Sequence, residues 1–70
     1  MAMGDVETFW ADGWWRNRIE GGETVTGVYP VRSIAAAVGR AMALSRHVIH
    51  VTSDEHGNVI ERDDFRRDSD

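Results

Sequence analysis

Hydrophobic and polar residues alternate in short runs through the first part of the chain, which is the pattern of β-strands. The first run, residues 6–10, is rich in β-branched and aromatic residues, and Asp-Gly at 12–13 is typical of a tight hairpin turn. A second run covers residues 14–20 up to a Gly-Gly pair, and a third covers residues 24–29. Three consecutive strands with short turns predict an antiparallel meander.

After Pro30 the spacing of the apolar residues becomes helical and stays so to about residue 45. Proline suits the first turn of a helix because its missing N–H would be unpaired there. Gly39, in the middle, costs roughly 1 kcal/mol relative to alanine but lets the helix lie close to a sheet. We therefore predict a helix over residues 31–45 with one apolar stripe. The stripe comprises Ile34, Ala37, Val38, Ala41, Leu44 and Ser45.

The strand pattern returns at residues 47–52 and 59–62, on either side of a polar loop. The predicted order is β-β-β-α-β-β, an α+β domain in which one helix packs on one face of an antiparallel sheet. The domain is expected to span residues 6–65, between a flexible N-terminus at 1–5 and a flexible charged tail at 66–70. The predicted core consists of Val6, Ile19, Val28, Ile34, Val38, Ala41, Ile49, Val51 and Ile60.

The composition narrows the class of protein. Seventy residues allow one small domain, which buries only about 60% of the surface that its unfolded chain exposes. The absence of cysteine excludes disulfides and thiolate metal sites, and we find neither a signal-peptide pattern nor an apolar run long enough to cross a bilayer. Twelve acidic against eight basic residues give a net charge of −4, which disfavours a general nucleic-acid binder. We expect a cytoplasmic protein without membrane association.

Several short motifs follow this order of elements. Residues 13–21 read Gly-Trp-Trp-Arg-Asn-Arg-Ile-Glu-Gly, an alanine-rich helix contains Gly39 and Arg40, a valine-rich strand contains His50, and a turn with Gly57 leads to an acidic-basic ending. Over about residues 6–65, these motifs resemble the domain of unknown function 2188 family of small bacterial and phage proteins. The resemblance implies this fold and no known activity.

Two positions depart from the pattern of that family. It usually begins its helix with a threonine cap and a glutamate three residues later, where this chain has Val31 and Ile34. It also favours an apolar residue two positions after the strand tryptophan, where this chain has Arg16. The first departure leaves the start of the helix open, and the second leaves open which face of residues 14–20 is buried.

His47 and His50 are the candidate metal ligands. Residues three positions apart on a strand point to opposite faces, so these two cannot bind one ion together. We predict one half-buried and one solvated strand histidine instead. The loop at residues 54–56 lacks the alternating oxygens of a calcium site and is expected to be a solvated turn. We predict no metal and no cofactor.

Catalytic signatures are also missing from the sequence. None of the four serines lies in a Gly-x-Ser-x-Gly motif, and Ser53, Asp54 and His56 are too close in sequence to converge as a triad. The pair at residues 63–64 is expected to lie in a charged tail, where nothing would shift its pKa. No glycine-rich phosphate loop occurs. We predict that the protein is not an enzyme and has no catalytic residues.

The aromatic residues gather around the first predicted turn. Because adjacent strand residues point to opposite faces, Trp14 and Trp15 cannot both face the helix. One of them must lie on the uncovered face of the sheet or at its rim, where an exposed apolar patch usually marks an interface. The alternative is that it packs under a loop or on arginine side chains. The predicted interface comprises Trp10, Trp14, Trp15, Arg16 and Arg18.

The leading hypothesis is a non-enzymatic module that acts through protein contacts, as a homodimer or with another protein, because a small core gains stability by association. A second hypothesis is single-stranded nucleic-acid binding by Trp14, Arg16 and Arg18, which share one strand face. Glu20 shares that face, and the net charge also opposes this hypothesis. A third hypothesis is a phage-type inhibitor that docks on a host protein through its acidic surface.

Overall fold

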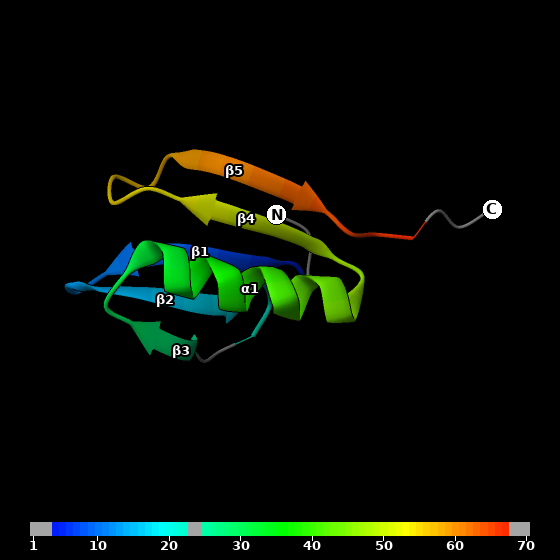
Figure 1. Cartoon of the computed structure of the whole chain (residues 1–70), viewed down its shortest axis with the longest axis horizontal. Coiled ribbons are helices and arrows are strands. Elements are labelled where there is room, and N and C mark those ends of the chain that lie inside the picture. The colour runs from blue at the N-terminus through cyan, green and yellow to red at the C-terminus, as the bar shows by residue number, and fades with distance from the viewer. Residues whose placement is uncertain (1–3, 23–24, 68–70) are drawn as a thin grey trace.

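In residues 4–22 and 25–67, which a computed structural model describes, five strands form one sheet and one helix lies across it (Figure 1). The strands are β1 (Val6–Ala11), β2 (Trp14–Ile19), β3 (Val25–Tyr29), β4 (Ile49–Ser53) and β5 (Val59–Asp64), and the helix is α1 (Arg32–Arg46). The predicted order of elements and the α+β class are confirmed. The expected start of the third strand, Thr24, lies outside the described residues.

The sheet is mixed, with strand order β3-β2-β1-β4-β5. Three of the neighbouring pairs are antiparallel, but β1 and β4 run parallel, with Val6 beside His50. The prediction of an antiparallel sheet was therefore wrong at this pair. The cause is the crossover: α1, with 15 residues, is about 22 Å long and returns the chain to the end of the sheet where β1 begins.

The backbone conformations of Asp12, Gly13 and His47 explain where β1 and α1 end. Asp12 and Gly13 both have positive φ, 52° and 83°, as a type I′ hairpin turn requires. His47, at φ 57°, ends α1 in the left-handed conformation, and the Val48 N–H donates to the Ala43 carbonyl at 3.1 Å. His47 therefore caps the helix, and the prediction that it lies on a strand was wrong.

The helix contacts the sheet through its smallest residues. Ala35, Gly39 and Ala43, spaced four apart, are the buried positions of α1. Thr8, Asn17 and His50, which are all buried, lie opposite Gly39, and we call them the polar cluster. A Cβ atom on Gly39 would lie 2.6 to 2.8 Å from these three side chains, so only glycine allows the observed approach.

The predicted apolar stripe of the helix faces solvent, which corrects the sequence interpretation. Ile34 is 49% exposed and Leu44 is 52% exposed, and Ala37 and Ala41 are exposed as well. Apolar or small residues occur nearly all round this helix, so periodicity alone does not select the inner face. The face with Gly39 turns inward because the polar cluster leaves room for no larger side chain.

The observed core therefore differs in part from the predicted one. Val6, Ile49 and Val51 are buried as predicted, and Ile19 and Val38 are partly buried. Four predicted core residues are exposed: Val28, Ile34, Ala41 and Ile60. The first and last of these lie on the edge strands β3 and β5, where a neighbouring strand is present on one side.

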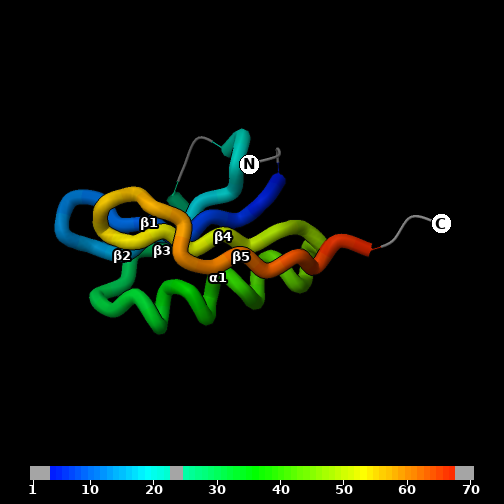
Figure 2. Tube along the Cα trace, turned by 90° about the horizontal axis from the view of Figure 1, so that it is seen from above, coloured from blue at the N-terminus to red at the C-terminus, as the bar shows by residue number. Residues whose placement is uncertain are grey.

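The two faces of the sheet are covered differently. Seen from above, α1 lies along one side of the sheet, and the turn at residues 20–22 rises on the opposite side (Figure 2). Within the described ranges no helix covers that opposite side, which we call the open face. No helix in these ranges is long and apolar enough to span a membrane.

The folded region begins before residue 6. The Gly4 N–H donates to the Glu20 carbonyl at 2.8 Å, and the buried Asp5 carboxylate accepts the Ile49 N–H at 3.2 Å. These residues were expected to belong to a flexible N-terminus, but they continue the contacts of β1 beyond Val6. Residues 1–3 and 68–70 lie outside the described residues.

The contact at Gly39 predicts an unusual effect of alanine in a helix. Gly39→Ala would normally stabilise a helix by up to ~1 kcal/mol, but here we expect the free energy of unfolding to fall by about 1–3 kcal/mol, because the new methyl group overpacks the polar cluster. Urea denaturation followed by circular dichroism measures the change. The exposed Ser45→Ala serves as the control and should change stability little. A Gly39→Ala variant more stable than the wild type would contradict the close contact.

Candidate functional site

The tryptophans of the predicted interface lie on both faces of the sheet. Trp15 is 7% exposed and faces the helix, where its ring meets that of Trp10 edge to face, with centroids 5.2 Å apart. The Arg32 guanidinium lies 5.6 Å from the Trp15 ring centroid. Trp10 and Trp15 therefore belong to the helix side of the sheet, which corrects their assignment to an open-face interface.

Trp14 lies on the open face and is 46% exposed. The prediction that adjacent tryptophans point to opposite faces is confirmed by this split. On the neighbouring strand β3, Val28 lies opposite Arg16 and is 48% exposed, and Val25 lies opposite Arg18 and is 39% exposed. We call Trp14, Val25 and Val28 the Trp14 patch. It is an exposed apolar part of the open face.

Sequence reasoning missed the two valines of this patch. A bulge between β2 and β3 places Val25 opposite Arg18, so that Val25 and Val28 turn to the same face. Strand alternation alone would have put them on opposite faces. A signal was nevertheless present, because β3 has no charged residue whereas the other edge strand, β5, has four in six.

The arginines of the predicted interface share the open face with Trp14, but both are already engaged. The Arg18 guanidinium lies 2.8 Å from the Glu7 carboxylate and 4.8 Å from the centroid of the Phe9 ring. The Arg16 Nε–H donates to the Ala11 carbonyl at 3.0 Å. Because Glu7 offsets the charge of Arg18, the centre of the open face is less cationic than its arginines suggest.

The polar cluster of Thr8, Asn17 and His50 lies on the helix side. The Thr8 hydroxyl donates to Asn17 Oδ1 at 2.5 Å, and Asn17 Nδ2 donates to the Ala35 carbonyl at 2.9 Å. Since the single Thr8 proton is used, His50 Nε2 donates to Thr8 Oγ1 over 2.8 Å. His50 Nδ1 then carries a lone pair that has no hydrogen-bond partner among the described residues.

Thr8, His50 and Asp63 are arranged in the order of a catalytic triad, with 2.8 Å from hydroxyl to imidazole and 3.9 Å from imidazole to carboxylate. A nucleophile must reach its substrate, however, and Thr8 is completely buried beneath Gly39. The arrangement therefore has a packing role in this fold.

His47 and His50, the candidate metal ligands, lie apart in the structure. Within residues 4–22 and 25–67 no group of three metal-ligating side chains is found. His47 is exposed at the end of the helix, and His50 is 1% exposed, more deeply buried than predicted. Burial is the main cause that lowers the pKa of His50, and the carboxylates of Asp63 and Glu61 partly oppose it.

Asp54 and Asp64 accept hydrogen bonds from residues that are close to them in the sequence. Asp54 accepts the N–H groups of Asn58 and His56 at 2.9 and 2.8 Å, which lowers the pKa of Asp54. Asp63 and Asp64 lie on β5, which corrects their placement in a tail. Hydrogen bonds from Arg66 lower the pKa of Asp64 to about 2, so the expectation of an unshifted pair was wrong there.

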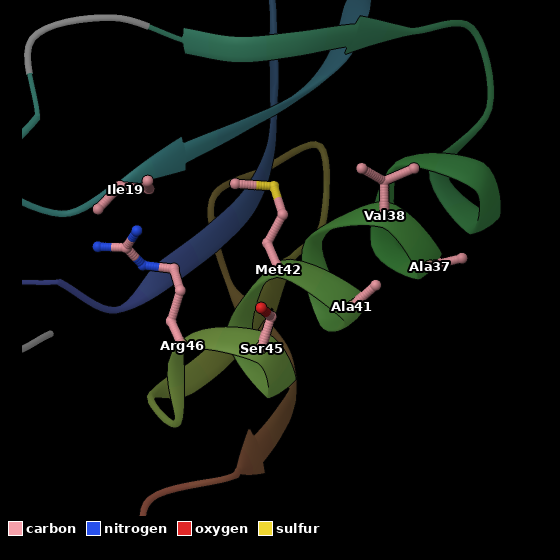
Figure 3. Close-up of a pocket in the computed structure, with 7 residues that line it drawn as sticks. All are labelled: Ile19, Ala37, Val38, Ala41, Met42, Ser45 and Arg46. Carbon is pink, nitrogen blue, oxygen red and sulfur yellow. The ribbon is translucent and has the colours of Figure 1, made fainter.

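A shallow groove of about 620 Å³ lies between α1 and β2. It is lined by Ile19, Ala37, Val38, Ala41, Met42, Ser45 and Arg46. Figure 3 shows the Met42 side chain extending from the helix toward the strands, with Ser45 and Arg46 at one end. The lining contains no acid, histidine or paired nucleophile, so the groove can offer apolar contact but no evident reaction chemistry.

With this geometry established, comparison with known proteins identifies the family. Residues 6–65 match the model of a family described as uncharacterized protein conserved in bacteria (DUF2188). The chain belongs to this family. No curated protein and no solved structure gave a significant match to the DUF2188 chain.

The motifs that pointed to the DUF2188 family meet mainly at the contact between helix and sheet. Asn17 comes from the basic second strand, Gly39 from the alanine-rich helix and His50 from the valine-rich strand, and all three touch in the polar cluster. Gly13 supplies the positive φ of the first turn. These motif residues therefore specify the DUF2188 fold, whereas Trp14 of the same motifs lies on an exposed surface.

The lowered pKa of His50 predicts how the stability of this DUF2188 domain depends on pH. The unfolded chain binds a proton near the ordinary pKa of 6.5, before the folded chain does, so the free energy of unfolding should fall as the pH drops from 7 to 5. The slope cannot exceed about 1.4 kcal/mol per pH unit for one proton. Denaturation at a series of pH values measures it.

His50→Gln should flatten this dependence, because glutamine does not titrate, whereas the exposed His47→Gln should preserve it. A wild-type stability that is constant or rises toward pH 5 would contradict the depressed pKa of His50.

Proposed function

We propose that this DUF2188 domain acts without catalysis, through protein contacts, and forms a homodimer through its open face. The observation that carries the proposal is the exposure of Trp14, 46%, on the face that no helix of the described chain covers. Burying a tryptophan removes a large apolar area from water, and an exposed apolar patch usually marks an interface. The Trp14 patch adds Val25 and Val28 to that area.

The open face offers a broad surface to a second copy of the chain. The molecule measures 42 × 23 × 18 Å, and the view down its shortest axis in Figure 1 shows the sheet broadside, so the open face is one of its two broadest sides. A standard interface buries about 800 Å² on each partner. In a two-fold dimer each Trp14 patch meets its own copy, so that one patch serves both protomers.

The outer side of α1 is the competing contact surface. Ile34 and Leu44 are about as exposed there as Trp14 is on the open face. We favour the open face because an exposed tryptophan supplies more contact area than either aliphatic residue with the same number of rotatable side-chain bonds. The two surfaces lie on opposite sides of the sheet, so substitutions distinguish them cleanly.

The dimer is tested by sedimentation at micromolar concentrations. We expect the wild type to be a dimer and Trp14→Ser to be a folded monomer, because the substitution removes the largest side chain of the Trp14 patch. Ile34→Ser and Leu44→Ser are matched controls on the helix and should remain dimers. A wild type that stays monomeric, or a dimer lost only with the helix variants, would contradict the proposal.

Single-stranded nucleic-acid binding is the second candidate. It is favoured by the position of Arg16 and Arg18 on the same face as Trp14, since aromatic and arginine side chains together can stack bases. It is opposed by the ion pair of Arg18 with Glu7, which would have to break or share its charge. The homodimer therefore remains the first proposal.

Tryptophan fluorescence separates the two candidates. We expect no quenching of the wild-type protein by single-stranded oligonucleotides at low salt, because Arg18 is already paired and the net charge is −4. Quenching that weakens steeply with salt, and that is lost in the double variant R16Q/R18Q, would establish nucleic-acid binding instead.

A further inference from the structure

A cleft of about 420 Å³ lies between α1 and the β4–β5 hairpin, on the flank of the helix away from the apolar groove of Figure 3. The helix contributes Arg32, Ser33, Ala36, Ala37 and Arg40, and the strands contribute Thr52, Ile60 and Glu61. The lining thus has two cationic side chains on the helix, one acidic side chain on β5, hydroxyl groups on both the helix and the sheet, and apolar walls. None of them belongs to the open face proposed above as an interface.

The two arginines of the cleft are positioned by aromatic rings rather than by close ion pairs. Arg32 lies over the ring of Trp15 at 5.6 Å, and no ion pair of Arg32 is found in the described part of the chain. Arg40 lies over the ring of Phe65 at 5.2 Å, and its nearest carboxylate oxygen, on Asp63, is 3.7 Å away. A guanidinium stacked on a ring keeps its in-plane N–H donors available.

The start of α1 adds positive potential at the same place. Val31, the N-cap residue, provides no side-chain hydrogen bond, and the first turn has no acidic residue. The first N–H groups of the helix therefore have no capping side chain, and the positive end of the helix dipole is not offset locally. Arg32 and Ser33, in this first turn, both line the cleft.

An independent observation comes from the sheet side of the cleft. Thr52 is 3% exposed, and its Oγ1 atom has no hydrogen-bond partner in the described residues. A buried hydroxyl without a partner destabilises a fold, so such groups call for an explanation. Thr52 lines the cleft together with the two arginines, and a ligand oxygen bound there could supply the missing partner.

We propose that this cleft binds the phosphoryl group of a small organic phosphate monoester. Arg32 with the first-turn N–H groups, Arg40, and the Thr52 hydroxyl all line this cleft, and three sets of donors suit the three terminal oxygens of a phosphoryl group better than the two of a carboxylate. The volume exceeds that of phosphate alone, and Ala36, Ala37 and Ile60 offer apolar contact to the rest of the ligand. Glu61 at the strand side disfavours a long polyanion.

Titration of the ¹⁵N-labelled protein with inorganic phosphate and with phenyl phosphate tests the proposal. We expect saturable shifts of the amides of Arg32, Ser33 and Thr52 with both probes, and several-fold tighter binding of phenyl phosphate because the walls are apolar. Arg32→Gln and Arg40→Gln should each weaken binding by about tenfold or more. Arg46→Gln, on the same helix but outside the cleft, is the matched control and should leave binding unchanged.

Thr52→Val separates a binding role from a structural one. Valine has the shape of threonine without the unpartnered hydroxyl, so the variant should be at least as stable as the wild type while binding phosphate several-fold more weakly. Three results would overturn the proposal. They are the absence of saturable shifts at millimolar phosphate, shifts that persist in R32Q and R40Q, and a Thr52→Val variant that binds each probe as tightly as the wild type does. Equal affinities of the wild type for the two probes would overturn the organic monoester as the ligand.

Discussion

The contact between Gly39 and the polar cluster of Thr8, Asn17 and His50 determines how the two layers of this small domain fit together. A helix usually packs on a sheet through apolar side chains, but here the closest approach lies over a hydrogen-bonded cluster. Asn17 also donates to the helix backbone at Ala35, which fixes the position of α1 along the sheet as well as its distance. Directional contacts of this kind specify one arrangement more sharply than apolar packing does.

The exposed apolar surface of the domain follows from this contact. Because the helix turns the face with Ala35, Gly39 and Ala43 toward the sheet, the larger residues Ile34 and Leu44 turn outward. In the described residues, a helix covers one side of the sheet, so Trp14 is left exposed on the other side. A domain with a polar centre and apolar outer sides is suited to association, which is the role that we propose for it.

Local signals in the sequence were sufficient for the order of elements, because turn residues such as Gly13 and the change of period after Pro30 act within a few neighbours. They were insufficient for the parallel pair of β1 and β4 and for the inner face of α1, because both depend on contacts between distant segments. The same division holds for the site. Strand alternation was enough to separate Trp14 from Trp15, whereas the position of Val25 on the open face and the unpartnered hydroxyl of Thr52 depend on a bulge and on tertiary packing.

The unequal edges of the sheet limit how copies of this chain could assemble by adding strands. A strand edge accepts another strand only where charged side chains do not oppose it, and β5 carries four charges while β3 carries none. If two copies join at β3, each has used its one uncharged edge, and the ten-stranded product (five strands from each described chain) ends in charged strands on both sides. Growth by sheet extension would then stop at a closed pair, and a continuing fibre is disfavoured.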